Sequence, residues 1–450
     1  MMIPYLFILI SSVFPIDFDP PFMEKYELEN GLTIVLSPTY DEPMIYINTL
    51  VKAGDMHGGE NKKIVSELTE ELLKFENQNF NSDEFSKYID EIGELWTSNG
   101  YDYTIFGIEG LKENIEKLIS LQSEVLRYPK FNKKEFERKK EMLLGWQKMT
   151  IEDRPYHQNA YHSQNMLLGT NINRYYSNND ITIDDVKSFY NSYYYPKNMI
   201  LMISGDFNVA HAKILIEKIF TDWKAGNNNQ STKKLISKKS DGIQVRFVES
   251  PDLLKPSIRI VMPAVDGHNP DFYSFYSTFN ILGRGRNSRI YNSINSISAN
   301  WEENYNSGFA WERTYNYMYY SYKSSYSQID TVYKLLLNEF KEIKQNNITI
   351  DELERVNKKM IGETILNHQS PAKWNWSVLS DISCDIPIEK IPLFTDNLKS
   401  LTIEDVNRIG EKYWDYEKFY LIVYGNKDST EAFLNQFEQV EYYQDKQLDY

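Results

Sequence analysis

The stretch MILMISG, residues Met199–Gly205, returns later in the chain as FYLIVYG, residues Phe419–Gly425. Both stretches are apolar, about one strand long, and end at a glycine, which is typical of a buried β-strand. A helix signature precedes each of them: TIDDV at Thr182–Val186 and TIEDV at Thr402–Val406. Strand and signature recur at the same separation of 220 residues, from 205 to 425 and from 182 to 402.

A third pair of segments supports the repeat. Phe136-Glu-Arg138 matches Leu353-Glu-Arg355 at a separation of 217 residues, from 136 to 353. Three matches in the same order at nearly one offset indicate a duplicated unit rather than chance. The sequence therefore predicts two copies of one domain.

Each copy mixes short strands and helices. Tyr26–Leu36 contains two strand-like segments joined at Asn30-Gly31, and Met44–Val51 is an apolar, β-branched strand. Tyr101–Glu109 alternates in polarity like one strand of a hairpin, and amphipathic helices follow. This order predicts the α+β class, with a mixed, partly antiparallel sheet and helices on one face.

The join between the copies lies in Lys224–Ser240 (KAGNNNQSTKKLISKKS), which is polar and has no apolar periodicity. Such a segment is typical of an exposed linker. We therefore expect a leader over residues 1–21 and an N-terminal domain over residues 22–223. The linker then spans residues 224–240, and the C-terminal domain residues 241–450.

The composition limits the possible partners. The chain has 450 residues, of which 41% are hydrophobic and 25% charged, so it is long enough for two globular domains. A formal net charge of -15 argues against nucleic acid and fits basic peptides or a basic protein surface better. The single Cys384 excludes an internal disulfide and a cysteine-based zinc site, and it fits either redox compartment.

The N-terminal segment Ile3–Phe14 (IPYLFILISSVF) is apolar and precedes the first charge, at Asp17. Its length suits the core of a signal peptide and is too short to span a bilayer. No Lys or Arg precedes it, and no small-x-small cleavage site follows it. We expect export, to a periplasm or outside the cell. Two alternatives remain: the segment packs on the rest of the protein, or the start codon has been placed too late. In either case the protein would be cytoplasmic or organellar. No other stretch could cross a membrane.

The most suggestive chemistry lies in Ile64–Phe75 (IVSELTEELLKF), whose apolar residues recur at helical spacing. Glu67 and Glu71 are four residues apart, with Glu70 between them, so they project from one side of the helix. This is the geometry of a metal-ligating helix, but carboxylates suit calcium or magnesium better than zinc. The alternative is a solvated acidic face.

Several further motifs occur in a familiar order: LENGL, a strand ending in Ala-Gly, PKNM leading to a strand that ends in Ser-Gly-Asp, and Leu-Gly followed by Ser-Arg-Ile. Their positions are Leu28–Leu32, Ala53-Gly54, Pro196–Met199, Ser204–Asp206, Leu282-Gly283 and Ser288–Ile290. This order resembles the inverzincin peptidases, the family of insulinase, pitrilysin and mitochondrial processing peptidase. The resemblance covers nearly the whole chain from about Phe22. It implies two homologous α/β/α-sandwich domains that form half of a clam-shell chamber.

The catalytic residues of that family do not carry over. Its His-x-x-Glu-His motif falls on Glu67-Leu68-Thr69-Glu70-Glu71, so the general base is nominally present as Glu70 and both histidines are replaced. The third ligand, a glutamate on a later helix, falls near Gly145, Trp146 or Gln147, none of which is a carboxylate. Catalytic zinc normally has three protein ligands. We therefore expect no zinc and no other cofactor.

The family's second domain offers an Arg and, seven residues later, a Tyr to the substrate. Those positions fall on Asn295 and on Trp301 or Glu302. The nearby arginines lack a Tyr at that spacing; they are Arg284, Arg286, Arg289 and Arg313. The resemblance therefore does not extend to the usual substrate-binding residues.

Other candidate ligands are weaker. His57-Gly-Gly-Glu60 mimics His-x-x-Glu, but two glycines make a poor helix, so we interpret it as a loop. His157 and His162 lie in the Tyr-, His- and Asn-rich stretch 156–176 and would point about 140° apart on a helix, which favours surface or packing roles. Glu141 or Glu152 could join the three glutamates around a hard divalent cation.

Three functions follow from these patterns. The leading hypothesis is a catalytically silent subunit that pairs with a homologous insulinase-family subunit, as a heterodimer or homodimer. It would contribute a chamber wall, a scaffold or binding of unstructured peptides. The alternatives are a metal-dependent endopeptidase with a remodelled site and a purely structural core subunit of a larger complex.

Overall fold

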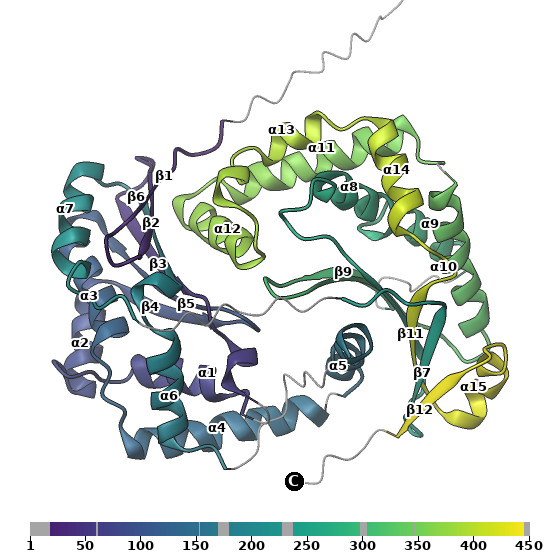
Figure 1. The fold of residues 1–450 in the computed structure, drawn as a ribbon, viewed down its shortest axis with the longest axis horizontal. Coiled ribbons are helices and arrows are strands. Elements are labelled where there is room, and N and C mark those ends of the chain that lie inside the picture. The colour runs from purple at the N-terminus through teal and green to yellow at the C-terminus, as the bar shows by residue number, and fades with distance from the viewer. Residues whose placement is uncertain are drawn as a thin grey trace, which may run out of the picture.

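The computed structural model describes residues 19–59, 62–152, 154–169, 180–226, 237–297, 304–345 and 347–444; for residues 148–152, 154–160 and 444 it describes the backbone alone. Two six-stranded sheets organise the molecule, and each is built from one copy of the sequence repeat (Figure 1). The predicted α+β class and the duplication are confirmed.

The first sheet has the strand order β1-β2-β6-β3-β5-β4. Strands β2 and β6 are parallel, and every other neighbouring pair is antiparallel. The strands are β1 (Glu24–Glu27), β2 (Thr33–Pro38), β3 (Met44–Val51), β4 (Glu94–Asn99), β5 (Thr104–Leu111) and β6 (Met199–Gly205).

The second sheet has the order β12-β7-β11-β8-β10-β9. The central strands β6 and β11 are the repeated stretches, and every residue of both is buried. Each is parallel to one neighbour and antiparallel to the other. The strands are β7 (Ile243–Glu249), β8 (Ser257–Pro263), β9 (Tyr305–Trp311), β10 (Asn316–Lys323), β11 (Phe419–Gly425) and β12 (Val440–Gln444).

Helices follow the same duplication. The repeated signatures cap α6 and α14 with the same box, in which Thr182 pairs with Asp185 and Thr402 with Asp405. No described helix carries an apolar run long enough for a bilayer. The helices of the first copy are α1 (Val65–Leu73), α2 (Ser82–Ile92), α3 (Ile115–Arg127), α4 (Lys133–Glu152), α5 (Arg154–Leu168), α6 (Ile183–Tyr193) and α7 (Val209–Phe220). Those of the second are α8 (Phe272–Gly283), α9 (Arg289–Asn295), α10 (Ile329–Lys344), α11 (Ile350–Asn367), α12 (Pro371–Ser383), α13 (Phe394–Lys399), α14 (Ile403–Tyr413) and α15 (Lys427–Leu434).

The two copies exchange one helix each. Helix α12 of the second copy packs on β3 and β6 of the first sheet, and α5 of the first copy packs on β8 and β11 of the second sheet (Figure 1). On α12, Asn375 Oδ1 accepts a hydrogen bond from Asn48 Nδ2 at 2.8 Å, and Asn375 Nδ2 donates to Ser204 Oγ at 3.0 Å. On α5, Leu167 and Leu168 join the buried cluster that covers β11. Each sheet is therefore the middle of an α/β/α sandwich whose third layer comes from the other copy.

Two corresponding hairpin turns also join the copies. The backbone N–H of Thr314, between β9 and β10, donates to Asp102 Oδ2, between β4 and β5, at 3.1 Å. Arg313 donates to the Asp102 carbonyl oxygen at 2.5 Å, and the rings of Tyr101 and Tyr315 meet edge to face at 5.2 Å. Asp102 and Thr314 are buried, so the contact is part of the interior.

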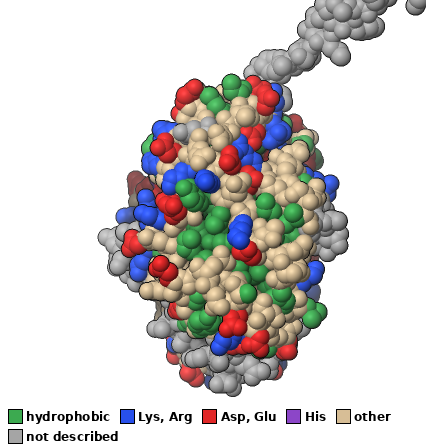
Figure 2. Space-filling model, turned by 90° about the vertical axis from the view of Figure 1, so that its right-hand side faces the viewer, with side chains coloured by type: hydrophobic (Ala, Val, Ile, Leu, Met, Phe, Trp, Pro, Cys, Tyr) green, Lys and Arg blue, Asp and Glu red, His purple; other side chains and the backbone are tan. Residues whose placement is uncertain are grey.

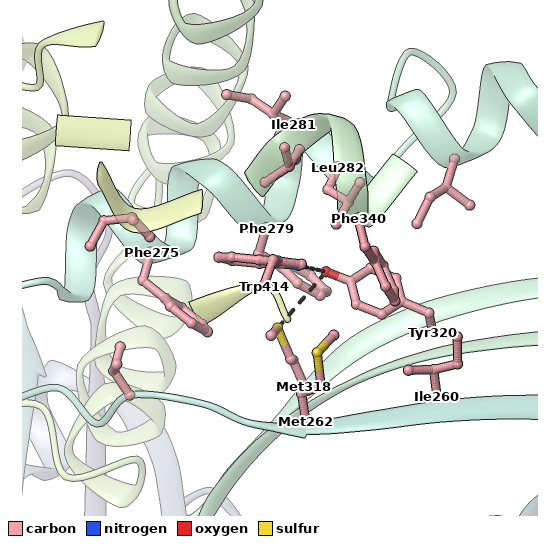
Figure 3. Close-up of a cluster of buried hydrophobic side chains, with 14 of the residues drawn as sticks. Ile260, Met262, Phe275, Phe279, Ile281, Leu282, Met318, Tyr320, Phe340 and Trp414 are labelled. Carbon is pink, nitrogen blue, oxygen red and sulfur yellow. Dashed lines mark hydrogen bonds between the residues drawn. The ribbon is translucent and has the colours of Figure 1, made fainter. Parts of the chain in front are cut away.

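The second copy has an aromatic core between β8, β10 and the helices α8, α10 and α14 (Figure 3). Trp414 Nε1 donates to the Tyr320 hydroxyl at 3.0 Å, beside the rings of Phe279 and Phe340. Large aromatic side chains contribute much of the apolar area that stabilises a core. Met262, near the end of β8, lies at the margin of this cluster.

Candidate functional site

The loop before α1 is held tightly against the β4–β5 turn. A Cβ atom on Gly54 would lie 2.3 Å from the carbonyl oxygen of Gly100, so only glycine fits there. The next residue, Asp55, accepts a hydrogen bond from Ser66 Oγ at 2.8 Å. These contacts fix where α1 begins and therefore where its glutamates lie.

The glutamates of α1 do not form a solvated acidic face. Glu70 is 5% exposed, and Glu67 and Glu71 are half-buried. Helix α1 packs against α4, α6 and β4, so Glu70 and Glu71 reach the side chains of those elements. A buried carboxylate needs partners, because its charge is costly away from water.

Lysines and a threonine supply those partners. Lys74 Nζ donates to Glu70 Oε1 at 3.3 Å, to Glu71 Oε1 at 2.8 Å and to Thr97 Oγ1 at 2.7 Å. Lys139, from α4, donates to Glu71 Oε2, and the Thr97 hydroxyl, from β4, donates to Glu70 Oε1. Three of the four carboxylate oxygens are therefore occupied, and only the buried Glu70 Oε2 has no hydrogen-bond partner. We refer to these five residues as the lysine-bound site.

The two carboxyl groups differ in their protonation. Burial raises the pKa of Glu70, although Lys74 and the Thr97 hydroxyl act in the opposite direction. Burial also acts on Glu71, but hydrogen bonds from Lys139 and Lys74 lower the pKa of that carboxyl below its ordinary value. Glu71 is therefore held as a carboxylate, and Glu70 is shifted toward its neutral form.

This donor set does not fit zinc. On α4, a Cβ at Gly145 would meet nothing within 4 Å, and Trp146 is 57% exposed. In the part of the chain that the structure describes, no three His, Cys, Asp or Glu side chains gather as a metal site would require. Glu141 is exposed, and the side chain of Glu152 lies outside the described residues. The ammonium groups of Lys74 and Lys139 instead occupy carboxylate oxygens of Glu70 and Glu71.

His57 and His162 have packing roles. His57 lies in a 3-10 turn (η1, Asp55–Gly58), where its Nδ1 accepts from the Gly54 N–H at 3.1 Å and its ring meets Tyr193 edge to face. Burial lowers the pKa of His57 to about 4. His162, on α5, is 3.2 Å from Arg246 through Nδ1, and burial beside that guanidinium lowers its pKa to about 3. The His157 side chain lies outside the described residues.

Of the three second-copy positions that align with the family's substrate-binding residues, the structure describes only Asn295. Asn295 is exposed at the end of α9, and Trp301 and Glu302 lie outside the described residues. Arg289 forms a two-pronged ion pair with Glu352, at 2.7 and 2.8 Å, so it stabilises the contact between α9 and α11.

Lys74, Lys139 and Thr97 were not identified from the sequence. The spacing of Glu70 and Lys74, four apart on a helix, is a signal that predicts such a pair. Lys139 and Thr97 come from other elements, and only the fold brings them to Glu71 and Glu70.

Comparison with known proteins gives a consistent result. The family model described as insulinase (peptidase family M16) matches residues 34–172, and the model described as the peptidase M16 inactive domain matches residues 180–360. Together they cover more than two thirds of the chain. The zinc protease PqqE of Helicobacter pylori is 19% identical over 409 residues, which are 88% of this chain and 90% of that protein.

Solved structures share the fold. A peptidase M16 inactive domain from Pseudomonas fluorescens superposes with a TM-score of 0.79 at 17% identity, over 90% of this chain and 98% of that one. The first half of the periplasmic protease PqqL of Escherichia coli superposes with a TM-score of 0.72 at 14% identity, over 92% and 94% of the two chains. Against the whole of PqqL, 92% of this chain matches 49% of that protein.

Proposed function

The chain belongs to the insulinase family of peptidases, peptidase family M16, and on that premise we propose that it is a catalytically silent member that works beside a homologous subunit. It would supply a chamber wall and contacts to unfolded peptides, and the partner would supply any chemistry. The observation that carries this proposal is the lysine-bound site. Lys74 pairs with Glu70, at the position of the general base, and Lys74 and Lys139 both pair with Glu71, at the position of the second histidine.

Electrostatics explain why the lysine-bound site disfavours a metal. A divalent cation needs carboxylate oxygens that are free to coordinate it, and here they already accept hydrogen bonds from ammonium groups. Binding a cation would displace Lys74 and Lys139 and leave their charges beside it. Without a metal, Glu70 has no bound water of lowered pKa to use as a nucleophile. These contacts support a silent site.

The comparison with PqqL supports a partner. This chain corresponds to one half of that periplasmic protease, so we propose that a second, homologous half belongs to a separate chain and completes a clam-shell. Export is part of the proposal, and the apolar segment Ile3–Phe14 and the periplasmic PqqL support it.

Surface charge supports peptides or proteins as partners rather than nucleic acid. The net charge of the chain is -15. On the face drawn in Figure 2, acidic and basic side chains interleave around hydrophobic ones, without a continuous basic field. Nucleic-acid binding depends on such a field to neutralise phosphates.

Native mass spectrometry of the protein, isolated gently from its source, tests the proposal. We expect a mass without metal and with a second, homologous polypeptide attached. A lone chain that carries one zinc ion, and cleaves unfolded peptides until Glu70→Gln stops it, would refute the proposal. Calorimetry with calcium, magnesium and manganese tests the remodelled-site alternative, which requires binding tighter than millimolar. A partner that is a component of a membrane complex would assign the chain a structural role instead.

A further inference from the structure

A cleft lies at one end of the second sheet, in a different copy from the lysine-bound site. It has a volume of about 410 Å³, within the usual range for small-ligand sites. The ends of β8 and β10 form its floor, α14 forms one wall, and the end of the linker forms the other. Its lining includes Lys239, Met262, Val265, Asn316, Lys412 and Lys418.

Asn316 is the unusual member of the floor. It is 6% exposed, and its side-chain Oδ1 is buried without any hydrogen-bond partner. Its backbone oxygen, in contrast, accepts from Ser237 Oγ at 3.0 Å and from the Ala264 N–H at 3.2 Å. Buried polar side-chain atoms are nearly always paired, so an orphaned acceptor in the wall of a cleft indicates a missing donor.

The direction of the Asn316 side chain follows from the pairing of the strands. Asn316 lies opposite Trp311 on β9, and Trp311 stacks on Phe272 of α8. Side chains on a strand alternate between faces, so Asn316 lies on the face covered by α8, as does Met318, which lies in the core beside Met262 (Figure 3). The orphaned carbonyl therefore points to the side where α14 and the cleft lie.

The charged groups of the cleft leave an excess of positive charge. Lys412 is paired with Asp271 at 2.7 Å, and the lining residue Asp415 is paired with Lys344 at 3.2 Å. The other acidic lining residue, Asp266, accepts two backbone N–H groups. Over the described ranges, Lys239 and Lys418 have no such ion pair. Asp266 contributes one negative charge to the lining, so Lys239 and Lys418 leave the cleft with an excess of positive charge on a chain whose net charge is -15.

We propose that this cleft binds the carboxylate end of a peptide chain. Three features of a C-terminal residue match three features of the cleft. Its carboxylate fits between Lys239 and Lys418, its backbone N–H supplies the donor that Asn316 Oδ1 lacks, and an apolar side chain fits against Met262 and Val265. An inorganic anion offers the first of these features alone. The proposal does not depend on whether the chain is catalytically silent.

Calorimetry on the full chain tests the proposal with two probes, N-acetyl-Ala-Leu and the same dipeptide with an amidated C-terminus. We expect the free acid to bind and the amide to bind at least about tenfold more weakly, because the amide loses the charge-assisted hydrogen bonds. Lys418→Gln should weaken binding of the acid by about tenfold. Lys323→Gln, an exposed lysine at the far end of β10, is the matched control and should have no effect.

Asn316→Leu separates a binding role from a structural one. It removes an orphaned acceptor from the interior, so we expect binding to fall several-fold while thermal stability stays the same or rises. Equal binding of acid and amide, displacement of the acid by an equal concentration of inorganic phosphate, or no binding at millimolar concentration would each overturn the proposal.

Discussion

Lys74 connects the buried Glu70 and the half-buried Glu71 of α1 to β4, so replacing Lys74 tests whether charge pairing holds the site together. Lys74→Met keeps most of the apolar stem and removes the ammonium group. That group makes three hydrogen bonds, to Glu70, Glu71 and Thr97, and the side chain is 24% exposed. The carboxylate of Glu70 is then left with only the Thr97 hydroxyl.

The structure sets the size of the effect. Breaking a fully buried ion pair by removing one partner costs about 3–5 kcal/mol, and exposed pairs contribute about 0–1 kcal/mol. Lys74 lies between these limits because its partners are largely buried and it is not. We therefore expect Lys74→Met to lower the free energy of unfolding by about 2 kcal/mol. Lys139→Met should cost only about 1–2 kcal/mol, because Glu71 keeps Lys74 and is more exposed than Glu70.

Hydrogen–deuterium exchange of peptides from α1 and β4 measures the effect where it occurs, and urea unfolding followed by circular dichroism measures it for the whole chain. Lys87→Met, an exposed lysine on α2, is the control. The loss should depend on pH. Since Lys74 lowers the pKa of both carboxyls, the difference between variant and wild type should shrink as the pH falls and Glu70 and Glu71 become protonated.

A second substitution completes the test. In the Lys74→Met background, Glu70→Gln removes the uncompensated charge and should recover more than half of the lost stability. If Lys74→Met is as stable as the wild type, or if Glu70→Gln lowers its stability further, then charge pairing does not hold the site together.

Three further predictions concern the fold. Gly205 has φ +117° and its Cβ would lie 2.0 Å from a carbonyl oxygen of β3, so Gly205→Ala should cost about 2–4 kcal/mol in urea unfolding. Its repeat counterpart Gly425 meets nothing closer than 2.9 Å, so Gly425→Ala should cost less than about 1 kcal/mol, and equal losses would contradict this reasoning. Asn375→Leu should cost about 2–4 kcal/mol because it leaves buried partners on β3 and β6 unpaired, whereas Lys373→Ala on the exposed side of α12 should have little effect. The pKa of His162 falls from 6.5 to about 3 on folding, so its contribution to stability declines as pH drops through that window; His162→Gln should flatten the decline by up to about 1.4 kcal/mol per pH unit, and an unchanged profile would exclude the effect.

Much of the fold could be predicted from the sequence because short-range signals determine its helices and strands, and the same signals occur in both copies of the repeat. The repeated strands are β6 and β11 with the predicted bounds at their glycines, and the repeated signatures begin α6 and α14. Capping boxes and buried apolar strands are determined by residues that are close together in the sequence, so both can be identified from the sequence alone.

The candidate site was only partly predictable. The sequence shows Glu67 and Glu71 where the family resemblance predicts histidines, but it does not show that lysines pair with Glu70 and Glu71. Lys139 is 68 residues from Glu71, and no local pattern indicates that α4 brings it there. The stretch that forms α5 was assigned no element, because its Tyr, His and Asn residues show no apolar stripe, and its role is to cover a sheet of the other copy.

The exchange of α5 and α12 has a consequence for how the protein is made. Once the chain has been synthesised as far as Gly205, the end of β6, all strands of the first sheet are present. Helix α12, which ends at Ser383, has not yet been synthesised. At 5–20 residues per second, the face that α12 covers stays open for about 10–35 s. During that interval Asn48 and Ser204 are exposed on the sheet face that α12 later covers. A shorter chain that stops after the first copy would keep that face open permanently, so the two halves must mature together.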